Sequence, residues 1–370
     1  MIIKNLEVKH ETIPLKVPFK TALRTATEIE SVEVIITLEN GITGRGAAAP
    51  TYVITGDSLE SILGALKGPI KAAIIGRDVK EFQLLLQSVQ SCCVGNTSAK
   101  AAADIALHDA YSRLIEVPLH TYLGGKKTLS TCMTIGVDTP EKMTKAAKSA
   151  VADGFQVLKI KVGANPELDI ERIQKIHEAI PSYIKLRLDA NQLRLDANQG
   201  WRAKQAVQII HEMESRNFNI EFIEQPVPSY DLDGLKFVTN RVSTLIMADE
   251  SLFSVKDALK LVAGRYVDLL NIKLMKCGGI NEAWKIASIA EANGVGCMIG
   301  SMMEPCFSVG AAAHFAAAHP NVHYFDLDAP LWLDGDLDVL TYHGDQVILS
   351  ALPGVGDVQT TFQGIKKDAT

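Results

Sequence analysis

Residues 267–279 read VDLLNIKLMKCGG, a nearly all-apolar stretch that ends in lysines and glycines. Apolar residues at both alternating positions predict a strand at 267–273 that is buried on two faces, as in a parallel sheet covered by helices. Comparable strands are predicted at 131–135, 155–162, 184–198, 220–224, 244–249, 295–299 and 322–326. Helical periodicity between the strands predicts helices at about 140–153, 166–180, 202–216, 231–240, 254–264, 280–293 and 308–318. Eight strands alternating with seven helices predict an α/β fold, a (β/α)7β barrel of the TIM type.

The barrel is flanked by two shorter regions. Residues 1–125 are predicted to form an α+β domain, residues 126–330 the barrel, and residues 331–370 a Gly- and Pro-punctuated segment that packs back on the first domain. The first region combines strands with β-branched residues and helices with apolar periodicity. The predicted strands are 2–13, 31–39 and 42–48, and the predicted helices are about 58–75, 79–91 and 97–116.

Composition limits the classes of function. The net charge of −6 provides no basic field for nucleic acid or an anionic membrane, so the partner is expected to be a small molecule. No signal peptide and no run of about 18 apolar residues occurs, which excludes a membrane span. The six cysteines show no C-x-x-C spacing, which favours a reduced, cytoplasmic protein without structural zinc.

Acidic residues end three successive strands. The third strand ends in Asp-Ala-Asn, the fourth in Glu224-Gln225-Pro226 and the fifth in Asp249-Glu250-Ser251. Neighbouring strands lie about 4.8 Å apart, so one carboxylate from each strand converges on a small volume at the carboxyl end of the barrel. Three like charges there require a cation, and an all-oxygen ligand set favours Mg²⁺.

Lysines end the second and sixth strands. Lys159 and Lys161 are two residues apart and are expected to point to one face, where each would lower the pKa of the other. Lys273 ends the sixth strand, which lies opposite the second in a ring of eight. A substrate carboxylate bound to Mg²⁺ would present its α-carbon between these lysines, so one can remove a proton and the other return it to the opposite face. This arrangement predicts racemisation or epimerisation.

The eighth strand ends in Asp326-Leu327-Asp328. In the ring it lies opposite the fourth strand, so its carboxylates would meet the far end of a bound substrate. A pair of carboxylates at that position favours a cationic group, such as a free ammonium.

Together these motifs resemble the muconate-lactonising-enzyme subgroup of the enolase superfamily. The resemblance is carried by KIKVG, DANQGW, IEQP, ADES, NIKLMKCGG and FDLDAP, and it covers nearly the whole chain, including an N-terminal capping domain. Within the subgroup the sequence is most similar to dipeptide epimerases of the L-Ala-D/L-Glu type, in which an Asp-x-Asp pair holds the ammonium of the dipeptide. Homo-oligomers are common among such barrels, so a homo-oligomer is expected.

The resemblance implies a role for each matching residue. Lys161 and Lys273 would be the two acid/base groups, and Lys159 would assist Lys161 and help to bind the substrate carboxylate. Arg24, in FKTALRT, would meet the side-chain carboxylate of the substrate. Asp326 and Asp328 would bind the ammonium group. The Mg²⁺ ligands would be Asp196, Glu224 and Asp249.

The third strand leaves an alternative open, because LRLDANQ occurs twice in tandem, at 186–192 and 193–199. The spacing from Lys161 suits Asp189, whereas the spacing to Glu224 suits Asp196. Only the second copy continues into Gly200-Trp201, as the family motif does, which favours Asp196.

Two other functions also stay open: an o-succinylbenzoate synthase or N-acyl amino acid racemase, and a barrel that is catalytically inert because its third strand is disrupted.

Overall fold

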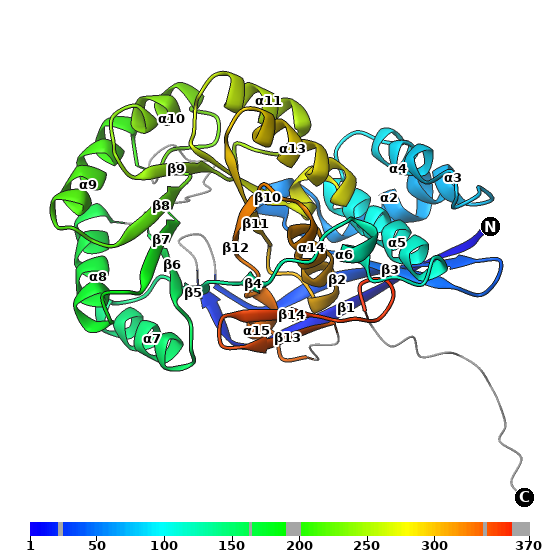
Figure 1. The fold of residues 1–370 in the computed structure, drawn as a ribbon, viewed down its shortest axis with the longest axis horizontal. Helices are drawn as coiled ribbons and strands as arrows, with labels where there is room; N and C mark the ends of the chain where they lie inside the picture. The colour runs from blue at the N-terminus through cyan, green and yellow to red at the C-terminus, as the bar shows by residue number, and fades with distance from the viewer. Residues whose placement is uncertain (21–24, 163–164, 190–200, 336–338, 357–370) are drawn as a thin grey trace, which may run out of the picture.

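The computed structural model describes residues 1–20, 25–162, 165–189, 201–335 and 339–356. Figure 1 shows a ring of strands surrounded by helices, and beside it a smaller domain of long strands and helices. No described helix combines the length and the apolar character that crossing a membrane requires.

The smaller domain contains a three-stranded antiparallel sheet, β1 (Ile3–Lys20), β2 (Thr25–Leu38) and β3 (Thr43–Ala48). Helix α5 (Thr97–Leu114) packs directly on β3. A Cβ atom on Gly44 would lie 2.2 Å from the carbonyl oxygen of Ala106, and one on Gly46 would lie 1.9 Å from that of Ala102. The two glycines therefore allow the helix backbone to approach the strand closely. The other helices are α1 (Tyr52–Thr55), α2 (Leu59–Ala65), the π-helix η1 (Leu66–Ile70), α3 (Lys71–Ile74), α4 (Phe82–Ser91) and α6 (Leu119–Tyr122).

The barrel contains one parallel sheet whose eight strands are paired in chain order, which confirms the predicted (β/α)7β fold. The amide of Cys132, just before the first strand, donates to the carbonyl of Phe325 in the last strand (3.4 Å) and so joins the two edges. The strands are β5 (Met133–Ile135), β6 (Val157–Lys161), β7 (Lys185–Asp189), β8 (Ile220–Glu224), β9 (Leu245–Ala248), β10 (Leu269–Lys273), β11 (Gly296–Gly300) and β12 (Val322–Phe325). The helices are α7 (Pro140–Ala152), α8 (Pro166–Ala179), α9 (Ala203–Ser215), α10 (Leu232–Thr239), α11 (Val255–Ala263), α12 (Leu274–Cys277), α13 (Ile280–Ala292) and α14 (Cys306–Ala318).

Alternation along the strands sorts side chains between the helices and the bore. In β10 every residue is buried, and Leu270 and Ile272 join the main core while Asn271 and Lys273 project on the other face. Deeper in the barrel, Phe222, Met247, Leu269 and Met298 form a separate apolar cluster. Phe222 and Met247 stand two positions before the acids Glu224 and Asp249, so an apolar floor lies beneath the polar mouth of the barrel.

The C-terminal region returns to the smaller domain. After α15 (Ala329–Trp332), strands β13 (Leu340–His343) and β14 (Gln346–Leu349) form a sheet with β4 (Leu129–Ser130). The amide of Val355 then donates to Asp109 of α5 (2.7 Å), and its carbonyl contacts Nε2 of buried His314 in α14 (3.0 Å). The segment thus links both domains, while the boundaries at 125/126 and 330/331 stay predictions.

Candidate active site

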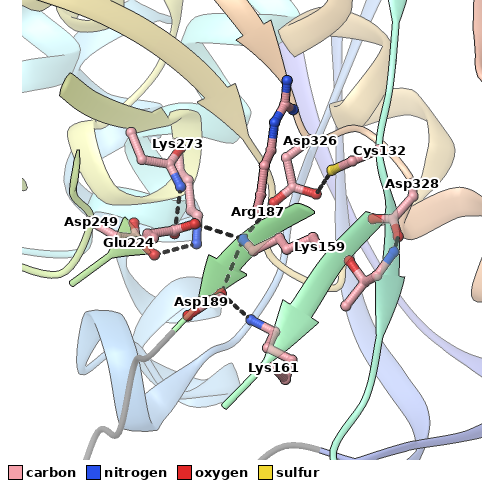
Figure 2. Close-up of polar contacts among 12 residues, drawn as sticks. Cys132, Lys159, Lys161, Arg187, Asp189, Glu224, Asp249, Lys273, Asp326 and Asp328 are labelled. Atoms are coloured by element: carbon pink, nitrogen blue, oxygen red, sulfur yellow. Dashed lines mark hydrogen bonds and ion pairs between the residues drawn. The ribbon is translucent and has the colours of Figure 1, made fainter. Parts of the chain in front are cut away.

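Carboxylate and ammonium groups alternate at the carboxyl ends of the barrel strands (Figure 2). The ammonium of Lys159 occupies the centre of the group. Its Nζ lies 3.0 Å from Asp189 Oδ2, 2.9 Å from Glu224 Oε2 and 2.7 Å from Asp326 Oδ2. The three carboxylates come from β7, β8 and the end of β12, so one lysine of the second strand connects both sides of the bore.

Two further lysines lie against the same group from opposite strands. Lys161, the last residue of β6, pairs with Asp189, its register partner on β7. Lys273, the last residue of β10, lies 2.7 Å from Asp249 Oδ2. The side chain of Lys161 is 19% exposed and that of Lys273 is 8% exposed, so both ammonium groups are largely removed from water. The two lysines therefore face the carboxylate group from the second and the sixth of eight strands.

Asp249 is held from several directions. Its carboxylate also pairs with Lys276 of α12, and its amide donates to Oε1 of Gln225 (3.0 Å). Gln225 has φ 45°, in the left-handed region that non-glycine residues rarely adopt. This turn after β8 directs the Gln225 side chain toward the end of β9, which fixes two neighbouring acid-bearing strand ends to each other.

Burial and neighbouring charges separate the pKa values of the acids. Burial would raise the pKa of Asp189, but the ammonium groups of Lys159 and Lys161 outweigh it and hold this pKa below its usual value. Lys273 and Lys276 do the same for Asp249. Burial and the charge of Asp189 instead raise the pKa of Glu224 to about 7. The cluster is therefore short of positive charge at Glu224.

The acids after β12 occupy the far side of the site. Asp326 contacts Lys159 through Oδ2, and Cys132 Sγ lies 3.4 Å from its Oδ1. Asp328 Oδ2 accepts from the amide of Thr134 (2.7 Å) and from Nε1 of Trp332 (3.3 Å). Burial, followed by the charge of Asp326, raises the pKa of Asp328 to about 6. This pair forms an anionic wall that would gain from a nearby cation.

Two family descriptions match the chain. The mandelate racemase/muconate lactonizing enzyme N-terminal domain matches residues 3–124, and the enolase C-terminal domain-like description matches residues 142–357. The chain belongs to the mandelate racemase/muconate lactonizing enzyme family.

Relatives in the family carry closely related names. The L-Ala-D/L-Glu epimerase of Clostridium acetobutylicum is 45% identical over 360 residues, which covers 96% of this chain and 98% of that protein. A substrate-liganded complex of the L-Ala-D/L-Glu epimerase from Bacillus subtilis superposes with a TM-score of 0.93 at 46% identity, covering 97% of this chain and 99% of that one. A dipeptide epimerase from Enterococcus faecalis, complexed with Mg and L-Leu-L-Tyr, has a TM-score of 0.90 at 40% identity and covers 96% and 99%.

The structure brings most of the predicted site residues of this family member together. The lysines Lys159, Lys161 and Lys273 and the acids Glu224, Asp249, Asp326 and Asp328 all lie in the site just described. Asp196 and Arg24 lie outside the described residues. The described acid of the third strand is Asp189, the alternative from the first copy of the repeat, and it pairs in register with Glu224.

The donor set fits a divalent cation. Asp189, Glu224 and Asp249 are each at most 1% exposed, and all of their donor atoms are oxygens. Glu224 Oε2 is buried without a well-aligned hydrogen bond, although the ammonium of Lys159 lies within ion-pair distance. Among the described residues no group of three acidic, His or Cys side chains is arranged to hold a metal ion. The carboxylates of Asp189, Glu224 and Asp249 instead contact lysine ammonium groups. The acids therefore provide the charge and chemistry that Mg²⁺ requires, at positions that lysines neutralise here.

Several residues of the site were not predicted from sequence. Lys276 neutralises Asp249, and Asn271 donates to Glu224 Oε1 (2.8 Å). Glu250 is buried with no hydrogen bond to either carboxyl oxygen, and burial, followed by the charge of Asp249, raises its pKa well above the usual value. The guanidinium carbon of Arg187 lies 5.2 Å from the ring centroids of both Phe222 and Tyr324, and its Nη1 lies 3.1 Å from the carbonyl of Phe325. The inward register of Asn271 and Arg187, two residues before Lys273 and Asp189, is the signal that would have identified them.

Proposed function

We propose that this chain is a Mg²⁺-dependent dipeptide epimerase that inverts the α-carbon of the C-terminal residue of its substrate. The observation that carries the proposal is the pair Lys161 and Lys273, which approach one carboxylate cluster from opposing strands β6 and β10. Two bases on opposite faces of an α-carbon are what inversion by proton transfer requires. The names of relatives at 45–46% identity support the same reaction.

Asp189, Glu224 and Asp249 are the proposed ligands of Mg²⁺. Asp189 replaces Asp196 in this set because it is buried beside Glu224 and in ion-pair contact with Lys159 and Lys161. The bound ion would supply positive charge to the substrate carboxylate and so stabilise the negative charge that develops when the α-proton leaves. The relative from Enterococcus faecalis binds Mg together with a dipeptide, which supports this assignment.

The lysines carry the proton. In one direction a neutral Lys161 accepts the α-proton from its face, and the ammonium of Lys273 donates a proton to the opposite face. In the reverse direction the two roles exchange, so the total number of protons on the pair does not change. The expectation of a lowered pKa is wrong for Lys159: the acids around it outweigh the effect of burial and hold its pKa well above the usual value, so it remains an ammonium. Lys159 would bind the substrate carboxylate and help to neutralise its negative charge.

Asp326 and Asp328 are proposed to bind the free ammonium of the dipeptide. Both are buried, and the pKa of Asp328, raised first by burial and then by the charge of Asp326, supports a place for a cation beside Asp328. An L-Ala-L-Glu dipeptide is the first substrate to test, because the relatives at 45–46% identity bear that name and Arg24 was predicted to meet a second carboxylate. The relative at 43% identity is a hydrophobic dipeptide epimerase, so the second residue is the position to vary.

A polarimetric panel tests the proposal. Purified chain with MgCl₂ is mixed with L-Ala-L-Glu, L-Leu-L-Tyr, an N-succinyl amino acid or the precursor of o-succinylbenzoate. Optical rotation is expected to change with at least one free-amine dipeptide, to stop with EDTA and to return with excess Mg²⁺. Turnover of only the N-succinyl compound or the o-succinylbenzoate precursor would favour those activities instead. No turnover of any compound would favour an inert barrel.

We also propose a cytoplasmic location and a homo-oligomeric assembly. None of the six cysteines, all of which lie among the described residues, forms a disulfide, which supports a reducing, cytoplasmic setting. A homo-oligomer stays a prediction, and sedimentation velocity of the purified chain measures it directly.

A further inference from the structure

Adjacent cysteines lie at the end of α4 in the smaller domain. Cys92 and Cys93 are half-buried, whereas Cys132, Cys277, Cys297 and Cys306 are at most 7% exposed. The sulfur atoms of the adjacent pair lie 3.8 Å apart, and Cys92 Sγ also contacts the carbonyl of Val89 (3.2 Å). The two thiols are therefore side by side and partly accessible to solvent.

The backbone holds the pair in place. Lys100, itself 6% exposed, donates to the carbonyl of Cys93 (2.6 Å), and Gly95 and Asn96 turn the chain with φ values of 63° and 50°. Val94 beside the pair is 97% exposed. The thiols thus lie on a short turn whose start is fixed by a buried lysine and whose outer side is open to solvent.

The 3.8 Å distance between the two sulfur atoms allows both to bind a single thiophilic atom. Two sulfurs on a single tetrahedral zinc lie about 3.8 Å apart when each Zn–S bond is ~2.3 Å. Soft thiolate donors select soft centres. Among the described residues no third His, Cys, Asp or Glu joins the pair as a ligand, so a centre that requires four protein ligands is not served. An atom that needs only two sulfur ligands from the protein can be bound by this pair.

A disulfide between the two residues is less favourable. Adjacent Cα atoms across a trans peptide are about 3.8 Å apart, whereas disulfide-bonded residues usually have Cα atoms about 4.4–6.8 Å apart. Burial, followed by the neighbouring thiol of Cys93, raises the pKa of Cys92 to about 11, which keeps it protonated and a slow nucleophile near neutral pH. The pair is thus preserved as a dithiol.

We propose that Cys92 and Cys93 form a bidentate site for organic trivalent arsenicals of the R–As=O class. Two As–S bonds form, the As=O bond breaks, and the oxygen leaves as water with the two thiol protons. No oxidant or reductant is required. The site is independent of the epimerase activity, and its test does not depend on turnover.

Intact-mass spectrometry of the full chain with phenylarsine oxide tests the site. The wild type is expected to gain one arsenical less one water, and 2,3-dimercaptopropanol should remove it. Cys92→Ser and Cys93→Ser should each lose the stable adduct, whereas Cys297→Ser, which changes a fully buried cysteine, should keep it. Absence of an adduct on the wild type, or an adduct that survives in both serine variants, would overturn the proposal.

A second measurement covers the case in which a serine variant fails to fold. Wild-type chain is labelled with a maleimide, with and without the arsenical, and the labelled peptides are mapped. The arsenical should protect Cys92 and Cys93 together. Protection of only one of them, or of neither, would contradict a two-sulfur site.

Discussion

Replacing Lys273 or Lys161 with alanine removes one of two opposed bases without leaving a buried carboxylate unpaired. Asp249 keeps Lys276 after loss of Lys273, and Asp189 keeps Lys159, at 3.0 Å, after loss of Lys161. Stranding a buried charge typically costs about 3–5 kcal/mol, and these second ion pairs avoid that penalty. Both variants should therefore fold, and their defect should be chemical.

The expected catalytic loss follows from the role of each lysine. A positioned acid/base group contributes about 10²- to 10⁴-fold, or about 3–5 kcal/mol of barrier, so epimerisation should fall by at least that factor. Each variant still has one base beside the α-carbon. It should therefore exchange the α-proton of one stereoisomer and not of the other, and the two variants should prefer opposite isomers.

Proton NMR in D₂O measures this exchange on L,L- and L,D-dipeptides separately. Lys148→Ala, which changes an exposed lysine of α7, is the matched control and should behave as wild type. If the two alanine variants exchange the same isomer, or if both exchange both isomers at the wild-type rate, the two-base assignment is wrong.

Four further groups of variants test other parts of the site and fold. Asp189→Asn should weaken Mg²⁺ binding at least about tenfold in calorimetry while Asp196→Asn does not, and the reverse result would assign the metal to the second copy of the repeat. Deletion of residues 193–199 leaves one intact LRLDANQ before Gly-Trp and should retain activity in the polarimetric assay; complete loss would show that both copies are needed. Asp328→Asn should raise KM for free-amine dipeptides about 10- to 100-fold with little change in kcat, because it removes a charged partner worth about 1.5–3 kcal/mol, and an unchanged KM would exclude its contact with the ammonium. Burial lowers the pKa of His314 to about 3, below its unfolded value, so its stabilising effect is present above about pH 6.5 and is lost as the pH falls toward 3. His314→Gln should therefore remove about 2 kcal/mol of the stability difference between pH 7 and pH 5 in urea unfolding, and an identical pH dependence in both proteins would contradict this.

The strand ends could be predicted from sequence because their pattern is local. Strands β8, β9 and β10 each carry an apolar run followed by a polar residue, so Glu224, Asp249 and Lys273 were located without knowledge of their neighbours. The order of strands around the ring then predicted that Lys161 and Lys273 oppose each other. Chain-order pairing of all eight strands confirms the fold on which that argument depended.

The metal ligand of the third strand could not be predicted from the local sequence pattern. Two identical heptapeptides have identical strand propensity, so only tertiary pairing distinguishes Asp189 from Asp196. The prediction extended this strand over 184–198; β7 is described over Lys185–Asp189, where Asp189 pairs in register with Lys161 and Glu224, and residues 190–198 lie outside the described residues. The roles of Lys276 and Asn271 were missed for a related reason. Their partners, Asp249 and Glu224, belong to other strands, and no spacing within one strand reveals such contacts.

Deuterium incorporation by the wild-type chain tests the central claim most directly. With Mg²⁺ and L-Ala-L-Glu in D₂O, proton transfer between two lysines predicts that the α-hydrogen of the C-terminal residue is replaced by deuterium as the L,D epimer appears. The alanine α-hydrogen should remain, and EDTA should stop both processes. Formation of the epimer with its original hydrogen retained, or no exchange in any dipeptide with Mg²⁺ present, would contradict the account.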